Sequence, residues 1–317
     1  MDHTPVTHTA TDRTLGHFPS GRDVSVTVHR YEGGPGPTVF VQAAQHGIEL
    51  NGPAALRRLH ARLVDADIAG TVIVVPVANP LAFDHRSYLT PEAYDAFNSN
   101  FNRIWPGDGS GSFQERLVAN IWPLVEAADA AVDLHTGMPE MLEHVRFGAD
   151  DPEGRALAMA FGTEFLLADT GPVGDDDFAG KFRLAAAGAG VPAITAELSN
   201  SRTVQRSAAE AGVEGVWNVL RELDVVAGAV AATPEQRVLS DDAPRVVAEC
   251  SGLFELRSDL DVGSEVAAGE ELGDVFDPSS FERLETVVAS TDGVIYSAAS
   301  GGVVVTGERV VSIATRS

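Results

Sequence analysis

Two short stretches of the sequence place histidine and glutamate or aspartate where a buried strand is expected to end. The first is Gln45-His46-Gly47-Ile48-Glu49, and the second is Asp133-Leu134-His135-Thr136-Gly137. In open α/β sheets, sites gather at the carboxyl ends of the strands. A single histidine is more often a hydrogen-bonded structural residue. Together, two His and one Glu give zinc three protein ligands and leave one position for water. We therefore predict that His46, Glu49 and His135 bind one Zn²⁺ per chain.

Two further carboxylates occupy positions where they could assist such a site. Glu197 ends the stretch Thr195-Ala196-Glu197, again at an expected strand end. There it could take a proton from the attacking water and pass it to a leaving amine, or it could be only a solvated strand terminus. Asp133 lies two residues before His135, on the same face of the strand, and could orient that ligand or make an ordinary buried hydrogen bond.

A long irregular stretch, residues 79–112, carries two arginines. Arg86 follows Asn79-Pro80-Leu81-Ala82-Phe83, and Arg103 lies within Phe101-Asn102-Arg103-Ile104-Trp105-Pro106-Gly107. Loops of this length inside a compact domain are usually functional. Surface arginine is the default, but beside a zinc site one arginine can polarise a scissile carbonyl and another can hold a carboxylate.

These residues need a layered α/β framework to position them. Alternation or buried apolar runs predict strands at residues 24–31, 38–44, 71–78, 130–134, 165–167 and 193–197. Helical spacing predicts helices at about residues 53–64, 113–127 and 207–226. Strands that alternate with helices indicate a three-layer α/β/α domain with a mostly parallel mixed sheet.

The pattern changes near residue 230. Residues 231–244 are predicted to be a linker, and from residue 245 short Val-rich strands alternate with Gly turns and show no helical period. We therefore predict an N-terminal polar segment (residues 1–20), a zinc hydrolase domain (21–235) and a small, barrel-sandwich-like all-β domain (243–317).

Composition excludes several classes of protein. The 46 acidic and 22 basic residues give a formal charge of −24, which disfavours nucleic acid and anionic membranes as partners. One cysteine excludes an intrachain disulfide and a Cys-rich metal site. No apolar run could span a bilayer, and the first 20 residues lack signal-peptide features, so we expect a cytoplasmic protein. The acidic, Lys-poor composition suggests a salt-adapted source, or a high-GC genome that favours Arg and Ala.

The order of these motifs resembles the succinylglutamate desuccinylase/aspartoacylase family of the zinc metallocarboxypeptidase clan, over about residues 38–317. The resemblance rests on His-x-x-Glu, Asn-Pro-x-Ala-Phe, Arg, Asn-Arg-x-x-Pro-Gly, Asp-Leu-His-Thr and Thr-Ala-Glu in that order. Two positions depart from the family pattern. Ile48 stands where a polar residue is common, and Asn100 stands where an Asp usually precedes the Asn-Arg pair, which leaves the particular substrate open.

The resemblance implies a role for each matching residue. His46, Glu49 and His135 match the zinc ligands, and Glu197 matches the general base. Arg86 matches the arginine that polarises the scissile carbonyl. Asn102 and Arg103 match the pair that grips the substrate carboxylate.

The sequence thus predicts an amidohydrolase that deacylates an N-acyl amino acid or a similar small amide. A metallocarboxypeptidase acting on short peptides could use the same groups, and a catalytically silent sensor or scaffold is the non-enzyme alternative. The C-terminal domain also resembles a biotinyl or lipoyl carrier, but it contains no Lys to modify. We expect that domain to wall the site or to form the interface of a homo-oligomer. Tyr296 is its only tyrosine and could reach the substrate or pack structurally.

Overall fold

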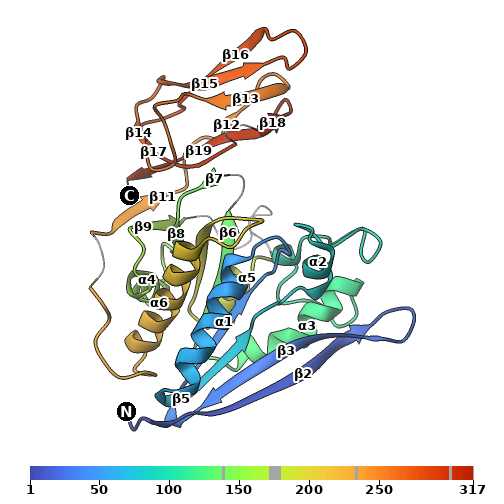
Figure 1. The fold of residues 1–317 in the computed structure, drawn as a ribbon, viewed down its shortest axis with the longest axis vertical. Helices are drawn as coiled ribbons and strands as arrows, with labels where there is room; N and C mark the ends of the chain where they lie inside the picture. The colour runs from blue at the N-terminus through green and yellow to red at the C-terminus, as the bar shows by residue number, and fades with distance from the viewer. Residues whose placement is uncertain (138–139, 171–179, 233–234, 300–301, 317) are drawn as a thin grey trace.

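Helices cover both faces of a large mixed sheet, and a smaller β unit stands at one end of it (Figure 1). This computed structural model describes residues 1–137, 140–170, 180–232, 235–299 and 302–316. The α/β domain and the β unit confirm the fold class that the sequence predicts.

The main sheet places the predicted site strands side by side. Its order within the α/β domain is β2-β3-β5-β4-β6-β10-β8-β9-β11, and the pairs β4–β5, β4–β6, β6–β10, β8–β9 and β9–β11 are parallel. The carboxyl ends of β4, β6 and β10 therefore meet at one edge. The bounds of these strands are β2 (Thr7–His17), β3 (Asp23–Glu32), β4 (Gly34–Ala43), β5 (Asp67–Val75), β6 (Ala130–Gly137), β8 (His144–Gly148), β9 (Phe165–Asp169), β10 (Ala193–Asn200) and β11 (Arg237–Ser240).

Alternating side chains of the strands supply two apolar cores, one on each face of the sheet. On β4, Val39, Val41 and Ala43 face one core, whereas Phe40 faces the other. The first core is covered by α1 (Asn51–Val64), α4 (Pro152–Phe161) and α6 (Arg206–Glu222). The second is covered by α3 (Phe113–Glu126) and α5 (Phe182–Gly188). Cover on both faces explains why the central strands appear in the sequence as continuous apolar runs.

The long stretch at residues 79–112 is irregular, as predicted, but it contains two short helical elements. These are α2 (Pro80–His85) and the 3₁₀ turn η1 (Phe101–Arg103). Asn79 begins α2, because its side chain accepts a hydrogen bond from the Ala82 N–H at 3.2 Å and Pro80 suits the first turn.

The prediction of a linker at residues 231–244 is wrong in part. β11 lies inside that stretch and pairs in parallel with β9 and antiparallel with β19 (Arg309–Arg316). A strand of four residues is too short to show a recognisable pattern in the sequence. The element nevertheless connects the α/β domain to the C-terminal strands.

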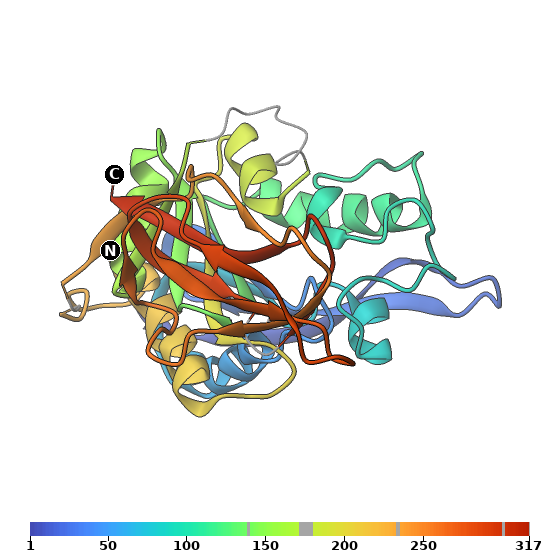
Figure 2. The same ribbon diagram turned by 90° about the horizontal axis from the view of Figure 1, so that it is seen from above.

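The C-terminal unit is built from short antiparallel strands. One layer has the order β16-β15-β13-β18, and the other consists of β14, β17, β19 and β12. Its position above the α/β domain is clear in Figure 1, and Figure 2 shows it covering the centre of that domain from above. The bounds are β12 (Val246–Val247), β13 (Gly252–Leu256), β14 (Glu265–Val266), β15 (Glu271–Phe276), β16 (Arg283–Val288), β17 (Gly293–Ala298) and β18 (Gly302–Val304).

The polar N-terminal residues take part in the sheet. β1 (Thr4–Pro5) pairs with β5, and β2 forms a long hairpin with β3 at the sheet edge. Within the described ranges, no helix combines the length and apolar character that a membrane span requires. The boundaries of the three predicted segments stay a prediction.

Candidate active site

The turn after β4 carries the first two predicted metal ligands. Ala44 adopts a positive φ of 53°, which turns the chain out of the strand. Gly47 lies between His46 and Glu49, and a Cβ there would come within 2.1 Å of the Ala82 backbone. Only glycine therefore allows the turn to pack against α2 at this point. The bond from the Glu49 N–H to the His46 carbonyl, at 3.2 Å, closes the turn.

The third predicted ligand lies on the neighbouring strand. β4 and β6 pair in parallel with Ala43 opposite Leu134, so His135 lies next to the turn. The structure brings His46, Glu49 and His135 together with one potential ligand atom from each within 4.8 Å of the others. All three side chains are buried, with exposed fractions of 4%, 2% and 3%. Three residues from two strand ends thus form one compact, buried polar group.

Both imidazoles present the same nitrogen to the glutamate. His46 Nδ1 lies 2.8 Å from Glu49 Oε1, and His135 Nδ1 lies 3.0 Å from Glu49 Oε2. The opposite nitrogens have other acceptors. His46 Nε2 lies 3.1 Å from Asn100 Oδ1, and His135 Nε2 lies 2.8 Å from Asp133 Oδ2. These outer contacts orient both rings so that each Nδ1 faces the glutamate, where it can offer a lone pair to a metal ion that displaces its proton.

The charged groups of this cluster change one another's pKa. Burial alone would raise the pKa of Glu49, but His46 and His135 lower it to about 2. Burial opposes a charge on His135, yet Asp133 and Glu49 raise the pKa of that ring well above its usual value. A buried carboxylate between two imidazoles therefore stays ionised.

This donor set fits a divalent metal. It offers two imidazole nitrogens and one carboxylate from buried, oriented side chains, and both histidines have outer hydrogen-bond partners. Three such ligands with an open position match the donor set of a hydrolytic zinc site. The group can therefore hold a metal ion.

Glu197 lies beside this group at the end of β10. Its backbone is opposite His135 on β6 and opposite His144 on β8. The carboxylate is half-buried and has no hydrogen-bond partner within the ranges that the structure describes. Burial raises the pKa of Glu197, with His135 opposing that rise and Glu49 adding to it. A free carboxylate of raised pKa beside a metal-binding group has the properties of a general base.

The residues predicted to bind substrate differ in their described contacts. Asn102 and Arg103 form part of η1, next to Asn100, which contacts His46. The Asn102 side chain accepts a bond from the Phe182 N–H at 2.8 Å, which leaves its amide NH₂ to donate elsewhere. The Arg103 side chain is exposed, and its guanidinium donates to the Asn102 carbonyl at 2.7 Å.

Arg86 is not joined to the group by a described contact. It ends α2 with a positive φ of 52°, and its side chain is exposed. Two residues later, Tyr88 stacks on His46 with ring centroids 4.1 Å apart. The segment that carries Arg86 therefore borders the metal-binding group, although the arginine itself points to no partner among the residues described.

Several contacts around the group were not predicted from the sequence. Gln45 donates to Asp133 Oδ2 at 2.6 Å and accepts from the Trp105 indole at 2.7 Å. It therefore links the turn after β4 to strand β6 and to the irregular stretch at residues 79–112. Asn100 contacts His46, and Tyr88 covers it. Gln45 and Asn100 each lie next to a predicted site residue in the sequence or in the fold. A Gln or Asn that orients a site side chain cannot, however, be told from an ordinary surface Gln or Asn by residue type alone.

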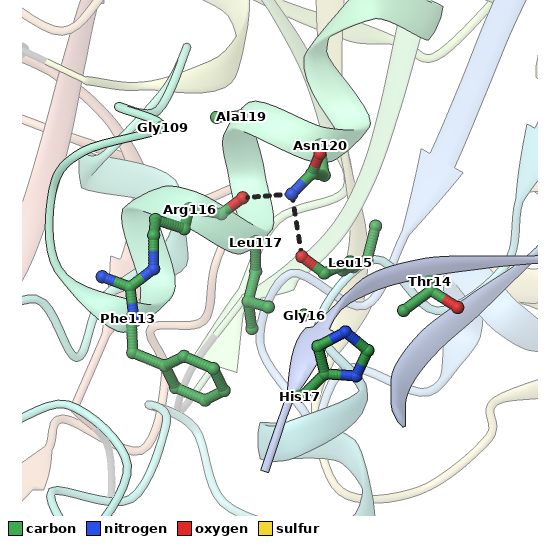
Figure 3. Close-up of a pocket in the computed structure, with 10 residues that line it drawn as sticks. All are labelled: Thr14, Leu15, Gly16, His17, Gly109, Phe113, Arg116, Leu117, Ala119 and Asn120. Carbon is green, nitrogen blue, oxygen red and sulfur yellow. Dashed lines mark hydrogen bonds between the residues drawn. The ribbon is translucent and has the colours of Figure 1, made fainter. Parts of the chain in front are cut away.

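A shallow hollow between β2 and α3 is separate from this group (Figure 3). On one side of the hollow, the Asn120 amide of α3 donates to the Leu15 carbonyl of β2 at 2.8 Å. It shares no residue with the His–Glu–His group, and its lining contains no carboxylate, so we assign it no part in the chemistry. The lining residues are Thr14, Leu15, Gly16, His17, Gly109, Phe113, Arg116, Leu117, Ala119 and Asn120.

Comparison with known sequences finds a family model and a curated relative that match most of this chain. Residues 35–223 match the family model described as the succinylglutamate desuccinylase/aspartoacylase catalytic domain. A curated relative, the N-alpha-acetyl-L-2,4-diaminobutyric acid deacetylase of Halomonas elongata, is 29% identical over 266 residues, which cover 80% of this chain and 75% of that protein. The family-model match, over residues 35–223, includes every residue of the metal-binding group and Glu197.

Solved structures resemble the whole chain. The product-bound ectoine utilization protein EutE (DoeB) of Ruegeria pomeroyi aligns with a TM-score of 0.86 at 25% identity, covering 99% of this chain and 100% of that one. A succinylglutamate desuccinylase/aspartoacylase of Rhodobacter sphaeroides aligns with a TM-score of 0.84 at 24% identity, with the same coverage. Both alignments include the C-terminal strands, so the two-part architecture is shared.

Proposed function

This chain belongs to the succinylglutamate desuccinylase/aspartoacylase family, and on that premise we propose that it is a zinc-dependent deacylase of an N-acyl amino acid or a similar small amide. The observation that carries the proposal is the buried His46–Glu49–His135 group with Glu197 beside it. Deacylase names among its relatives support hydrolysis of an amide.

We propose that His46, Glu49 and His135 hold the metal. Zn²⁺ bound there would supply Lewis acidity and would make water a stronger acid at neutral pH. The orientation of the two imidazoles by Asn100 and Asp133 supports this assignment, because such contacts fix the nitrogen that faces the ion.

Glu197 is the proposed general base. In this role its carboxylate accepts a proton from the attacking water and then delivers that proton to the leaving amine. Its raised pKa suits both halves of the transfer, since a carboxylate with the usual pKa is a weaker base. The absence of a hydrogen-bond partner within the described ranges leaves both of its oxygens available.

The substrate contacts are proposed on the placement of η1 and α2. Arg103 is exposed beside the group, and its guanidinium can bind a carboxylate through paired hydrogen bonds. The Asn102 amide can donate to the same carboxylate. Arg86, on the segment that borders His46, is the proposed donor to the scissile carbonyl. A cytoplasmic location and a homo-oligomer stay predictions of the sequence.

Amine release from a substrate panel tests the proposal. The panel contains Nα-acetyl-2,4-diaminobutyrate, N-succinylglutamate, N-acetylaspartate and short peptides, each with zinc-loaded protein and with a chelator. We expect chelator-sensitive release from acyl amino acids. Preference for peptides would instead support a metallocarboxypeptidase, and no release from zinc-loaded protein would favour a silent sensor or scaffold.

The variant Glu197→Gln tests the base directly. We expect it to keep its zinc and to lose a factor of roughly 10²–10⁴ in turnover, because the amide cannot accept the proton. Glu143→Gln is the matched control, since burial also raises the pKa of Glu143, to about 7, and we give that residue no catalytic role. Wild-type turnover in Glu197→Gln with zinc bound would contradict the mechanism.

A further inference from the structure

A second group of histidines converges away from the active site. His8, His29 and His60 each place one ring nitrogen within 4.8 Å of the others. His8 Nε2 and His29 Nδ1 are 3.1 Å apart, and the ring centroids of His8 and His60 are 4.9 Å apart. Each side chain is half-buried, and none of the three belongs to the active site.

The strand register explains why these side chains meet. In the β2–β3 hairpin, His8 is opposite Tyr31 and Ala10 is opposite His29. His29 and Tyr31 are two residues apart on one strand, so they share the face on which His8 also lies. Helix α1 packs on that face, and it contributes His60 between the buried Leu59 and Leu63. The three imidazoles therefore come from three separate elements, β2, β3 and α1.

Two of the rings, His8 and His29, have the protonation state that metal binding requires. Burial lowers the pKa of His8 and His29, and the neighbouring histidines lower it further, so these rings are neutral at pH 7. Burial also raises the pKa of Tyr31 to about 12, so its hydroxyl stays neutral. That hydroxyl lies 2.7 Å from His60 Nδ1 and orients the third ring, as outer partners do at metal sites.

We propose that His8, His29 and His60 form a second, structural binding site for a divalent transition-metal ion. Three imidazoles suit Zn²⁺, Cu²⁺ or Ni²⁺, whereas Ca²⁺ and Mg²⁺ prefer oxygen ligands that this group lacks. Ligand nitrogens around tetrahedral zinc are about 3.4 Å apart, given bonds of about 2.0–2.1 Å. His8 Nε2 and His29 Nδ1, at 3.1 Å, are close to that separation, and rotation of the His60 side chain would bring in the third nitrogen.

Such a site would join the N-terminal hairpin to α1. The three ligands are 21 and 31 residues apart along the chain, and β2 is the edge strand of the sheet. A metal ion that bridges them stabilises only the folded arrangement. This proposal does not rest on the proposed function, because it uses no residue of the active site.

Zinc stoichiometry tests the proposal. We expect the wild-type chain to bind two Zn²⁺ in competition with a chromophoric chelator, and His8→Gln/His60→Gln to bind one and retain amine release. The double variant His46→Ala/His135→Ala should bind one Zn²⁺ through the second group. His17→Gln is the matched control on the same strand, and it should bind two. An unchanged stoichiometry in His8→Gln/His60→Gln would overturn the proposal.

A second measurement needs no variant. Diethylpyrocarbonate modifies accessible neutral imidazoles, and mass spectrometry locates the modified residues. We expect Zn²⁺ to protect His8, His29 and His60 from modification and to leave the exposed His17 unprotected. Equal modification of the three residues with and without Zn²⁺ would refute the site even if the variants failed to fold.

Discussion

The rings of His46 and His135 are held in fixed orientations by hydrogen-bond partners within the protein. Each ring has an acceptor at Nε2, and each Nδ1 faces the same glutamate. The acceptors differ, since Asp133 is a carboxylate whereas Asn100 is an amide. A carboxylate makes an imidazole more basic and a stronger ligand than an amide does. The two histidines are therefore expected to bind a metal ion with unequal strength.

The contact of Asn100 with His46 yields a prediction about metal affinity. Asn100→Leu removes the acceptor of His46 Nε2, and we expect zinc affinity to fall roughly 10–100-fold, measured by chelator competition. Asn100→Asp is the control, because it keeps an acceptor and adds a charge, and it should bind zinc at least as tightly as the wild type. Equal affinity of the Leu variant and the wild type would contradict the role of Asn100.

His144 yields a prediction about acid stability. Burial, with a contribution from Arg146, lowers the pKa of His144 to about 3, against 6.5 when unfolded. The unfolded chain therefore binds a proton between these values that the folded chain does not, so stability falls as pH falls. From pH 7 to pH 5 this group should remove about 2 kcal/mol of unfolding free energy.

Replacing His144 by Asn isolates that effect. The amide can still donate to the Leu142 carbonyl, as Nδ1 does at 2.7 Å, but it does not titrate. Urea unfolding of both proteins at pH 7 and pH 5 measures the difference. The variant should lose less stability on acidification than the wild type, and an identical loss in both would show that His144 does not control this dependence.

At the scale of elements, the sequence predicts the strands and helices that have a recognisable apolar pattern, and it does not predict those that lack one. Buried strands such as β4 and β5 are continuous apolar runs because helices cover both faces, so their positions agree with prediction. β11 is not predicted from the sequence, because four residues are too few to show a periodic pattern. The hairpin partner of β3 was not recognised because the exposed, polar β2 lacks an apolar face over most of its length.

Some parts of the candidate site can be predicted from the sequence, and others cannot. His46, Glu49 and His135 were predicted because they follow recognisable strands, and strand ends in a parallel sheet must meet. The contacts of Asn100 and Tyr88 were not predicted, since they depend on how residues 79–112 fold back over the turn. The His8–His29–His60 group required the hairpin register and the helix position together.

At the scale of the whole molecule, the C-terminal unit is attached by both strands and side chains. β7 (Glu140–Met141), which follows the His135 strand, pairs with β17, and β11 pairs with β19. Tyr296 is buried against the α/β domain and its hydroxyl donates to Asp241 at 2.5 Å. Tyr296 thus has a packing role where the C-terminal unit meets the α/β domain. Pairing with β7 holds the C-terminal unit next to the segment that follows β6, above the α/β domain in Figure 1.

The net charge of −24 gives the last prediction, which concerns the response of the whole fold to salt. Surface carboxylates repel one another over a screening length of about 10 Å at 0.1 M salt and about 3 Å at 1 M. Thermal unfolding should therefore shift upward with KCl.

The concentration range of that shift separates two explanations of the composition. Simple screening is nearly complete by about 0.5 M, because the screening length is then shorter than most distances between surface charges. A salt-adapted surface should continue to gain stability up to about 3 M KCl, whereas a composition set only by codon bias should gain no more than screening provides. We expect the melting temperature to rise across both ranges. A plateau above about 0.5 M would reject salt adaptation, and no rise at all would show that charge repulsion does not limit this fold.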